Sequence, residues 1–228
     1  VGLHLTLTSE FNALRWSGLT GHSSLHDGEG KLHRTVAEFE RHADTAAVVR
    51  ELEAQYDAAR RSGIRITHAD NHMGSLYGMA TGRSHIPQAL RLCAKWRLPF
   101  RIFRKVYPGD PLLSTLPGVE RAVGKASALA GVLGVGIPDY LLSHPFSVQE
   151  GETYDSFKQS LIAKLYALPE GVSETYIHPG VDDAWMREHI PNWEKRVWEF
   201  RLMLDDDFAY ALKDAGVKLI DYRHIAVH

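Results

Sequence analysis

The chain has 228 residues, of which 44% are hydrophobic and 24% are charged, as expected for one soluble globular domain with a full core. Its 26 Lys and Arg residues nearly balance 28 Asp and Glu residues, so the net charge of −2 predicts no attraction to nucleic acid or to an anionic membrane. No apolar run approaches the ~20 residues of a membrane helix, and none has the form of a signal peptide. A small or neutral partner molecule is therefore favoured.

The single cysteine, Cys93, excludes a disulfide within the chain and lies in the apolar pattern of a predicted helix. We therefore expect a buried packing residue and a reducing, cytoplasmic location. The chain has no initiator methionine and opens directly on a predicted strand, so we expect a segment upstream of Val1 to be missing.

Short β-branched apolar runs alternate with longer stretches of helical periodicity, which is typical of repeated βα units around a parallel sheet. Six strands are too few for a complete eight-fold barrel. Residues 9–43 resemble a loop, and a loop of that length is usually functional or disordered. In chain order, the sequence predicts strand 2–8, helix 45–62, strand 64–70, helix 87–96, strand 99–103, helix 119–133, strand 139–144, helix 154–168, strand 174–178, a helix over 193–213 that breaks at 205–207, and strand 217–222.

Histidines recur where the predicted strands end. His68 and His72 follow the second strand, His144 ends the fourth and His178 ends the fifth, while His4 lies within the first. Parallel βα folds gather ligands and catalytic groups at the carboxyl edge of the sheet. We therefore expect these side chains to converge, as a metal site held by imidazoles and a carboxylate requires.

Each of these residues also has an ordinary explanation. His4 lies in an alternating apolar strand, where a hydrogen-bonded core histidine is the usual reading, but its pairing with His72 favours a ligand. His68 could instead donate to a carbonyl group or support a ligand, and Asp70 could bind metal, orient a histidine or cap the next element. The other histidines are expected to be structural or solvated, namely His22, His26, His33, His42, His85, His189, His224 and His228.

Four segments in order resemble the motifs of the YdjC-like carbohydrate deacetylases, the group that contains chitooligosaccharide deacetylase. They are GLHLTLT at 2–8, THADNH at 67–72, YIHPG at 176–180 and KLIDYR at 218–223, so the likeness runs nearly from end to end. The resemblance implies an α/β fold, a distorted and incomplete TIM-type (β/α) barrel with mostly parallel strands. It also implies a divalent metal, Mg²⁺ or Zn²⁺, and hydrolysis of an N-acetyl group from an amino sugar or oligosaccharide.

By this likeness, His4 and His72 stand at the two histidine ligand positions, and His178 matches the histidine expected to assist departure of the amine. The metal would activate water and stabilise the oxyanion, and the products would be acetate and a free amino sugar. Residues 1–228 would form a single deacetylase-like domain that lacks the family's first βα units. A homodimer is expected from the family alone.

Two departures limit the likeness. The family normally begins with a strand ending in Asp-Asp-Phe-Gly, which supplies a metal-binding carboxylate and the general base, and this motif is absent. Residues 205–208 read Asp-Asp-Asp-Phe but follow no apolar strand, so a helix N-terminus is the better interpretation. Relatives often carry a longer histidine cluster than the Asn-His-Met-Gly at 71–74, which bears on metal preference or substrate shape. We expect residues 1–228 to bind metal weakly and turn over slowly.

Two side chains, Trp16 and His144, are candidates for contact with the substrate. Trp16 could stack on an apolar sugar face, although packing is its commoner role. His144 is expected to support the site or contact substrate. Two alternatives stay open beside the deacetylase: a metal-dependent hydrolase of another amide or ester, and a catalytically impaired sugar-binding protein. A purely structural α/β domain is a more distant alternative.

Overall fold

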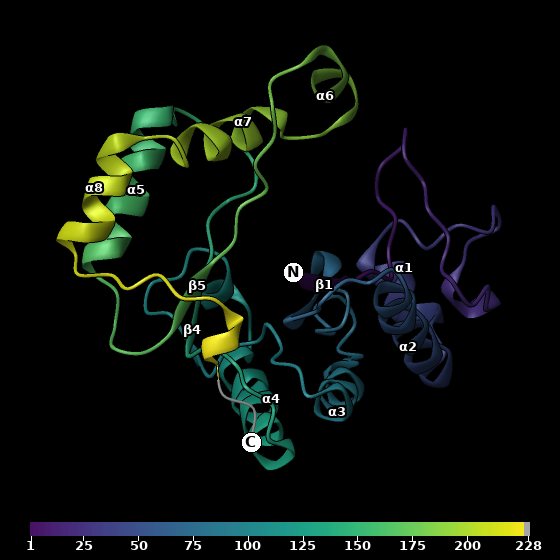
Figure 1. The fold of residues 1–228 in the computed structure, drawn as a ribbon. Coiled ribbons are helices and arrows are strands. Elements are labelled where there is room, and N and C mark those ends of the chain that lie inside the picture. Colours follow the sequence, from purple (N-terminus) through teal and green to yellow (C-terminus); the bar gives the residue numbers. More distant parts are fainter. Residues whose placement is uncertain (226–228) are drawn as a thin grey trace. The chain divides into compact units, whose positions relative to one another are not determined.

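A computed structural model describes residues 1–225, so His228 lies outside the described residues. The chain packs as two compact units. Of the described residues, the first unit comprises Val1–Arg104, Arg121–Ile137 and 221–225, and the second comprises Lys105–Glu120 and Pro138–Ile220. Figure 1 labels the main helices and strands of both units.

A parallel strand pair organises the first unit. Strand β1 (Gly2–Leu5) pairs with β2 (His68–Asn71) so that His4 lies opposite Asp70. The predicted strand at 99–103 is shorter in the structure, where only Phe100 forms a parallel bridge, with Ala69. The helices are α1 (Val36–His42), α2 (Thr45–Arg61), α3 (Ile86–Trp96) and α4 (Val119–Leu133).

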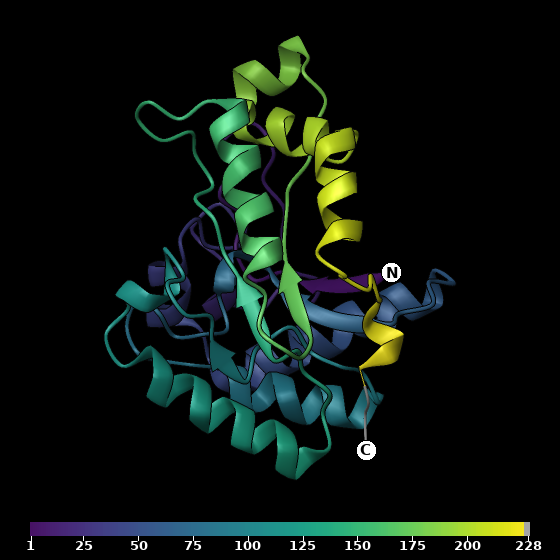
Figure 2. The same ribbon diagram turned by 90° about the vertical axis from the view of Figure 1, so that its left-hand side faces the viewer.

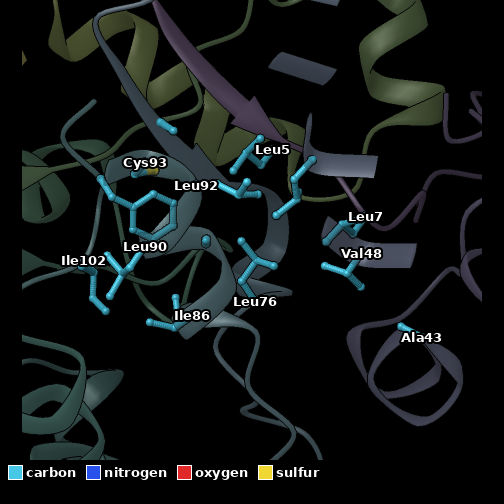
Figure 3. Packing of buried hydrophobic residues seen from close by; sticks show 14 of the residues in the cluster. Leu5, Leu7, Ala43, Val48, Leu76, Ile86, Leu90, Leu92, Cys93 and Ile102 are labelled. Carbon is cyan, nitrogen blue, oxygen red and sulfur yellow. The ribbon is translucent and has the colours of Figure 1, made fainter. Parts of the chain in front are cut away.

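Apolar side chains from the pair and its helices form the core of this unit. Leu5, Leu90 and Phe100 are fully buried, and burying a side chain of this size stabilises the fold by roughly 1.5–3 kcal/mol. Figure 3 shows how the α3 side chains pack with those of β1. Cys93 lies in this core, as predicted, and burial raises the pKa of its thiol.

The long segment between β1 and α2 is more ordered than its sequence suggests. It contains a 3₁₀ turn (Ser23–Leu25) and α1, which begins with a reciprocal capping box between Thr35 and Glu38. The buried carboxylate of Glu51 on α2 accepts hydrogen bonds from the backbone N–H groups of Leu19 (2.8 Å) and Thr20 (2.8 Å). Glu51 therefore fixes part of this segment on α2.

A three-stranded parallel sheet lies in the second unit, in the order β3-β4-β5. Helices α5 and α8 pack side by side here, as Figure 2 shows in green and yellow. The elements are β3 (Lys105–Val106), β4 (Tyr140–Leu142), α5 (Tyr154–Tyr166), β5 (Ser173–Thr175), α6 (Ala184–His189), α7 (Trp193–Leu202) and α8 (Asp206–Asp214).

The acidic run at 205–208 has the role that the sequence indicates. Asp205 is the N-cap of α8, where its side chain accepts from the backbone N–H groups of Asp207 (3.1 Å) and Phe208 (3.3 Å). Asp206 and Asp207 lie in the first turn, where negative charge favours the helix dipole. The predicted break between two helices is therefore confirmed.

The predicted α/β class with parallel strands is confirmed. Within residues 1–225 the strands form a two-stranded and a three-stranded sheet, neither of which closes, so a barrel is not shown. The strand predicted at 217–222 is wrong. Leu219 is 75% exposed and pairs with no strand among residues 1–225, and the chain instead enters a 3₁₀ turn (Tyr222–His224) capped by Asp221. In the part of the chain described, no helix is long and apolar enough to span a membrane.

Candidate active site

The register of β1 and β2 brings His4 and Asp70 together. His4 Nδ1 lies 2.9 Å from Asp70 Oδ2, and Arg101 Nη1 donates to the same oxygen at 2.7 Å. Burial alone would raise the pKa of Asp70, but the hydrogen bond from His4 and the nearby positive charges outweigh it and hold the pKa below its usual value. Asp70 is therefore a buried anion that orients the His4 ring.

His72 completes a pair of imidazoles. His72 Nδ1 lies 3.3 Å from His4 Nε2, and His72 Nε2 lies 2.8 Å from Glu10 Oε2. One nitrogen of each ring is thus occupied by a carboxylate, and the other nitrogen faces its partner ring. A carboxylate behind a histidine is the usual arrangement in metal sites, where it fixes the tautomer of the ligand.

The spacing of the two facing nitrogens fits a pair of metal ligands. With zinc–nitrogen bonds of about 2.0–2.1 Å and tetrahedral angles, two ligand nitrogens lie about 3.3 Å apart. His4 Nε2 and His72 Nδ1 have this separation. Within residues 1–225, however, no group of three or more His, Cys, Asp or Glu side chains is arranged to hold a metal ion. The described residues therefore offer two nitrogen donors and an incomplete ligand set.

The backbone immediately after His72 is unusual. Met73 has φ = 53° and ψ = 17°, a left-handed conformation that L-residues adopt with strain. Thr8 donates its hydroxyl to the Met73 sulfur at 3.4 Å, and the Met73 side chain is 42% exposed. The turn that follows the candidate ligand is thus held in a costly shape, as is common at functional sites.

Trp16 lies beside this pair. Its ring meets that of His72 edge to face at 5.9 Å between centroids, and that of Phe11 at 6.1 Å. The indole Nε1 donates to the backbone oxygen of Thr8 at 2.8 Å, and the side chain packs partly against the core. Trp16 therefore has a packing role, and it also lies next to a candidate metal ligand.

His68 lies apart from the imidazole pair. Its ring stacks on Tyr222 at 3.9 Å between centroids, and its Nδ1 lies 3.0 Å from the Thr67 hydroxyl. A Cβ on Gly2 would come within 2.4 Å of His68 Nε2, so glycine leaves room for this ring. His68 lines a cavity of about 370 Å³, whose other lining residues are Val1, Arg65, Thr67, Asp221, Tyr222 and Arg223.

In the second unit, His144 follows β4 and is 3% exposed. Its Nε2 lies 2.8 Å from Glu199 Oε1, while its Nδ1 is buried with no hydrogen-bond partner in the described chain. The ring stacks loosely on Tyr176 at 5.9 Å. Such burial favours a supporting role for His144 over contact with a substrate.

His178 follows β5 and is half-buried. Its ring meets those of Phe146 (5.5 Å) and Tyr176 (5.9 Å) edge to face, and its backbone N–H donates to Glu199 Oε2 at 2.7 Å. The carboxylate of Glu199 thus joins His144 to the main chain of His178.

Three further side chains contact the predicted site residues, and the sequence did not predict them. Glu10 contacts His72, Arg101 contacts Asp70, and Glu199 contacts the backbone of His178. None of the three carries a distinct signal in the sequence, because each partner comes from a different part of the chain.

The chain is similar to known proteins over most of its length. A family model described as YdjC-like protein matches residues 1–214, nearly the whole chain and parts of both units. The chain therefore belongs to the YdjC-like family, and the resemblance drawn from its motifs is confirmed.

One curated relative is a carbohydrate deacetylase from Thermus thermophilus, which is 40% identical over 76 residues. The match covers 33% of this chain and 28% of that protein, so the chain matches little more than a quarter of the relative's length. A crystal structure from Enterococcus faecalis V583, of a protein provisionally named for cellobiose-phosphate cleavage, has a TM-score of 0.72 and 22% identity. The structural match covers 99% of this chain and 77% of the Enterococcus chain, and it shows that the two share a fold.

Proposed function

We propose that this chain belongs to a metal-dependent deacetylase that removes the N-acetyl group from an amino sugar or oligosaccharide and releases acetate. Family membership and the carbohydrate deacetylase relative support the reaction class. The proposed metal dependence rests on His4 Nε2 and His72 Nδ1, which face each other. The other nitrogen of each ring contacts a carboxylate. The parallel strands support a distorted, incomplete TIM-type barrel as part of the same proposal.

His4 and His72 are the residues we propose to hold the metal, Mg²⁺ or Zn²⁺. When bound, such an ion lowers the pKa of a coordinated water and stabilises negative charge that develops on the acetyl oxygen. Asp70 accepts a hydrogen bond from His4 Nδ1–H, so that Nε2 keeps its lone pair. Glu10 does the same for His72 Nε2 and leaves the Nδ1 lone pair free to coordinate.

His178 is the residue we propose to protonate the departing amine. An amide nitrogen leaves poorly without a proton, and a protonated imidazole near neutral pH can supply one. The sugar is expected to use Trp16, because an aromatic ring next to His72 offers an apolar face of the kind that sugar rings stack on.

Acetate release tests the proposal. The purified chain is incubated with N-acetylglucosamine oligomers and either Zn²⁺ or Mg²⁺, and free acetate is measured. We expect His4→Asn and His72→Asn to abolish release and to lower metal content. His42→Asn is the matched control, because His42 is an exposed histidine of the same unit bonded to the backbone of Glu38. Full activity in either site variant would refute the assigned ligands.

One observation favours the second candidate function, a catalytically impaired sugar-binding protein. Within residues 1–225, the side chains supply two metal donors and no third. This alternative predicts that oligosaccharides bind, as seen by calorimetry, without release of acetate at any metal concentration. Cleavage of simple amides or esters in place of amino sugars would instead favour a hydrolase with a different substrate. A homodimer stays a prediction.

A further inference from the structure

Helix α7 holds the turn that bears His178. The backbone N–H of His178 donates to Glu199 Oε2 at 2.7 Å, and Arg196 Nη1 approaches the His178 carbonyl oxygen at 3.5 Å. Two residues on, the N–H of Gly180 donates to the Arg196 carbonyl at 3.1 Å. The turn is thus fixed through its main chain to one face of α7.

Glu199 is the buried centre of this arrangement. The residue is 2% exposed, and both carboxylate oxygens are used, Oε2 by His178 N–H and Oε1 by His144 Nε2. His144 Nδ1 has no partner among residues 1–225, so the His144 proton belongs on Nε2, where it is donated to Glu199. His144 therefore anchors the carboxylate. A buried carboxylate is costly to desolvate, and apolar packing would stabilise the unit at least as well.

We infer that Glu199 is a positioning residue for His178: its carboxylate fixes the main chain of the His178 turn and so sets the direction of the imidazole. The inference rests on the proposed role of His178 as the acid. The ring also meets those of Phe146 and Tyr176 edge to face, so a shift of the main chain would move the imidazole relative to these rings. A displacement of about 1 Å in a catalytic group can cost about 100-fold in rate.

Two substitutions separate the hydrogen bond from mere packing. Glu199→Gln keeps an oxygen that can accept from His178 N–H, and its NH₂ group then faces His144 Nε2, so the His144 proton moves to Nδ1. Glu199→Met has a similar length and no acceptor. Glu194→Met is the matched control, since Glu194 is exposed in the first turn of the same helix.

With an N-acetyl sugar, we expect Glu199→Met to lower kcat by about 10- to 100-fold with little change in KM. Glu199→Gln should remain within about 5-fold of wild type, because the hydrogen bond is kept. Equal losses in the Gln and Met variants, or a loss expressed in KM alone, would overturn the inference.

The double variant His178→Ala/Glu199→Met shows whether Glu199 acts through His178. If it does, the double variant is no slower than His178→Ala alone, because the group being positioned is already absent. Hydrolysis of 4-nitrophenyl acetate should keep its wild-type rate in His178→Ala and in Glu199→Met, because the 4-nitrophenolate leaving group departs without a proton. Independent, multiplying losses in the double variant would contradict the inference.

An NMR measurement keeps the test independent of activity. The His178 amide proton and ring signals should shift in Glu199→Met and stay near wild type in Glu199→Gln and Glu194→Met. If Glu199→Met does not fold by circular dichroism, Glu199→Asp replaces it, because the shortened side chain cannot span both His144 and the His178 backbone. If wild type releases no acetate, the proposed function fails, yet these shifts still support the positioning role. Unchanged His178 signals in a folded variant overturn it.

Discussion

Glu10→Gln is the sharpest perturbation of the imidazole pair. The Glu10 carboxylate can only accept at His72 Nε2, so it fixes the proton there and leaves Nδ1 bare toward His4. A glutamine can turn its NH₂ group to Nε2 instead, which stabilises the tautomer that carries its proton on Nδ1. That proton lies on the nitrogen that a metal would need.

The size of the effect follows from the contact. Glu10 and His72 are partly shielded, with side chains 24% and 18% exposed, so the hydrogen bond at 2.8 Å is only partly screened by water. Removal of a partner that orients a metal-binding histidine typically costs 10- to 100-fold in metal affinity, or about 1.4–2.7 kcal/mol. We expect a loss in this range and no change in thermal stability of the metal-free protein beyond about 1 kcal/mol.

Competition calorimetry with Zn²⁺ measures this loss. Glu29→Gln is the control, because Glu29 is a carboxylate of the same segment that is 72% exposed and contacts Arg15 at 3.4 Å. Zinc affinity in Glu10→Gln equal to that in Glu29→Gln would refute the reasoning, since the carboxylate would then have no hold on the tautomer.

Three further predictions concern the first unit. Asp27 accepts a hydrogen bond from Arg15, which lowers the pKa of its carboxyl group to about 2. The ionised carboxylate therefore stabilises the fold above about pH 4, and this contribution is lost as the pH falls toward 2. In urea unfolding, the free energy of unfolding should fall less between about pH 5 and about pH 2.5 in Asp27→Asn than in wild type, by at most about 1 kcal/mol. Leu90→Ala should lower the free energy of unfolding by about 2–5 kcal/mol through the cavity it leaves, and a loss under 1 kcal/mol in urea would show that the core collapses around it. Glu51→Ala should cost about 3 kcal/mol or more and speed hydrogen exchange at Leu19 and Thr20, whose amides lose their acceptor, and unchanged exchange would contradict the anchoring role.

Local signals in the sequence predicted the helices well. Helix α4 spans Val119–Leu133, as predicted, and α2 ends at Arg61, where Gly63 takes the left-handed conformation (φ 77°) expected after a helix. Such signals lie within a few residues of the feature they define. The strand predicted at 217–222 shows their limit, because alternation of apolar residues does not reveal whether a sheet edge is available.

Only some residues of the candidate site could be predicted from the sequence, for a related reason. His4 and His72 stand out as residue types within recognisable motifs. Their carboxylate and cationic partners do not, because the fold alone brings together residues as distant as Glu10 and His72, 62 positions apart, or Asp70 and Arg101, 31 positions apart. An acidic residue in a loop and an arginine within a short predicted strand give no sign of function until the pairing is known.

The facing imidazoles also bear on how the first unit folds. His4 and His72 are 68 positions apart, and their ring nitrogens meet only once β1 and β2 have paired in register. A cation bound by both rings would tie the ends of this segment together like a reversible cross-link. Because the unfolded chain lacks the preformed pair, part of the binding free energy would become folding free energy. The resistance of the unit to heat and to proteases would then depend on the metal concentration, whether or not the chain catalyses a reaction.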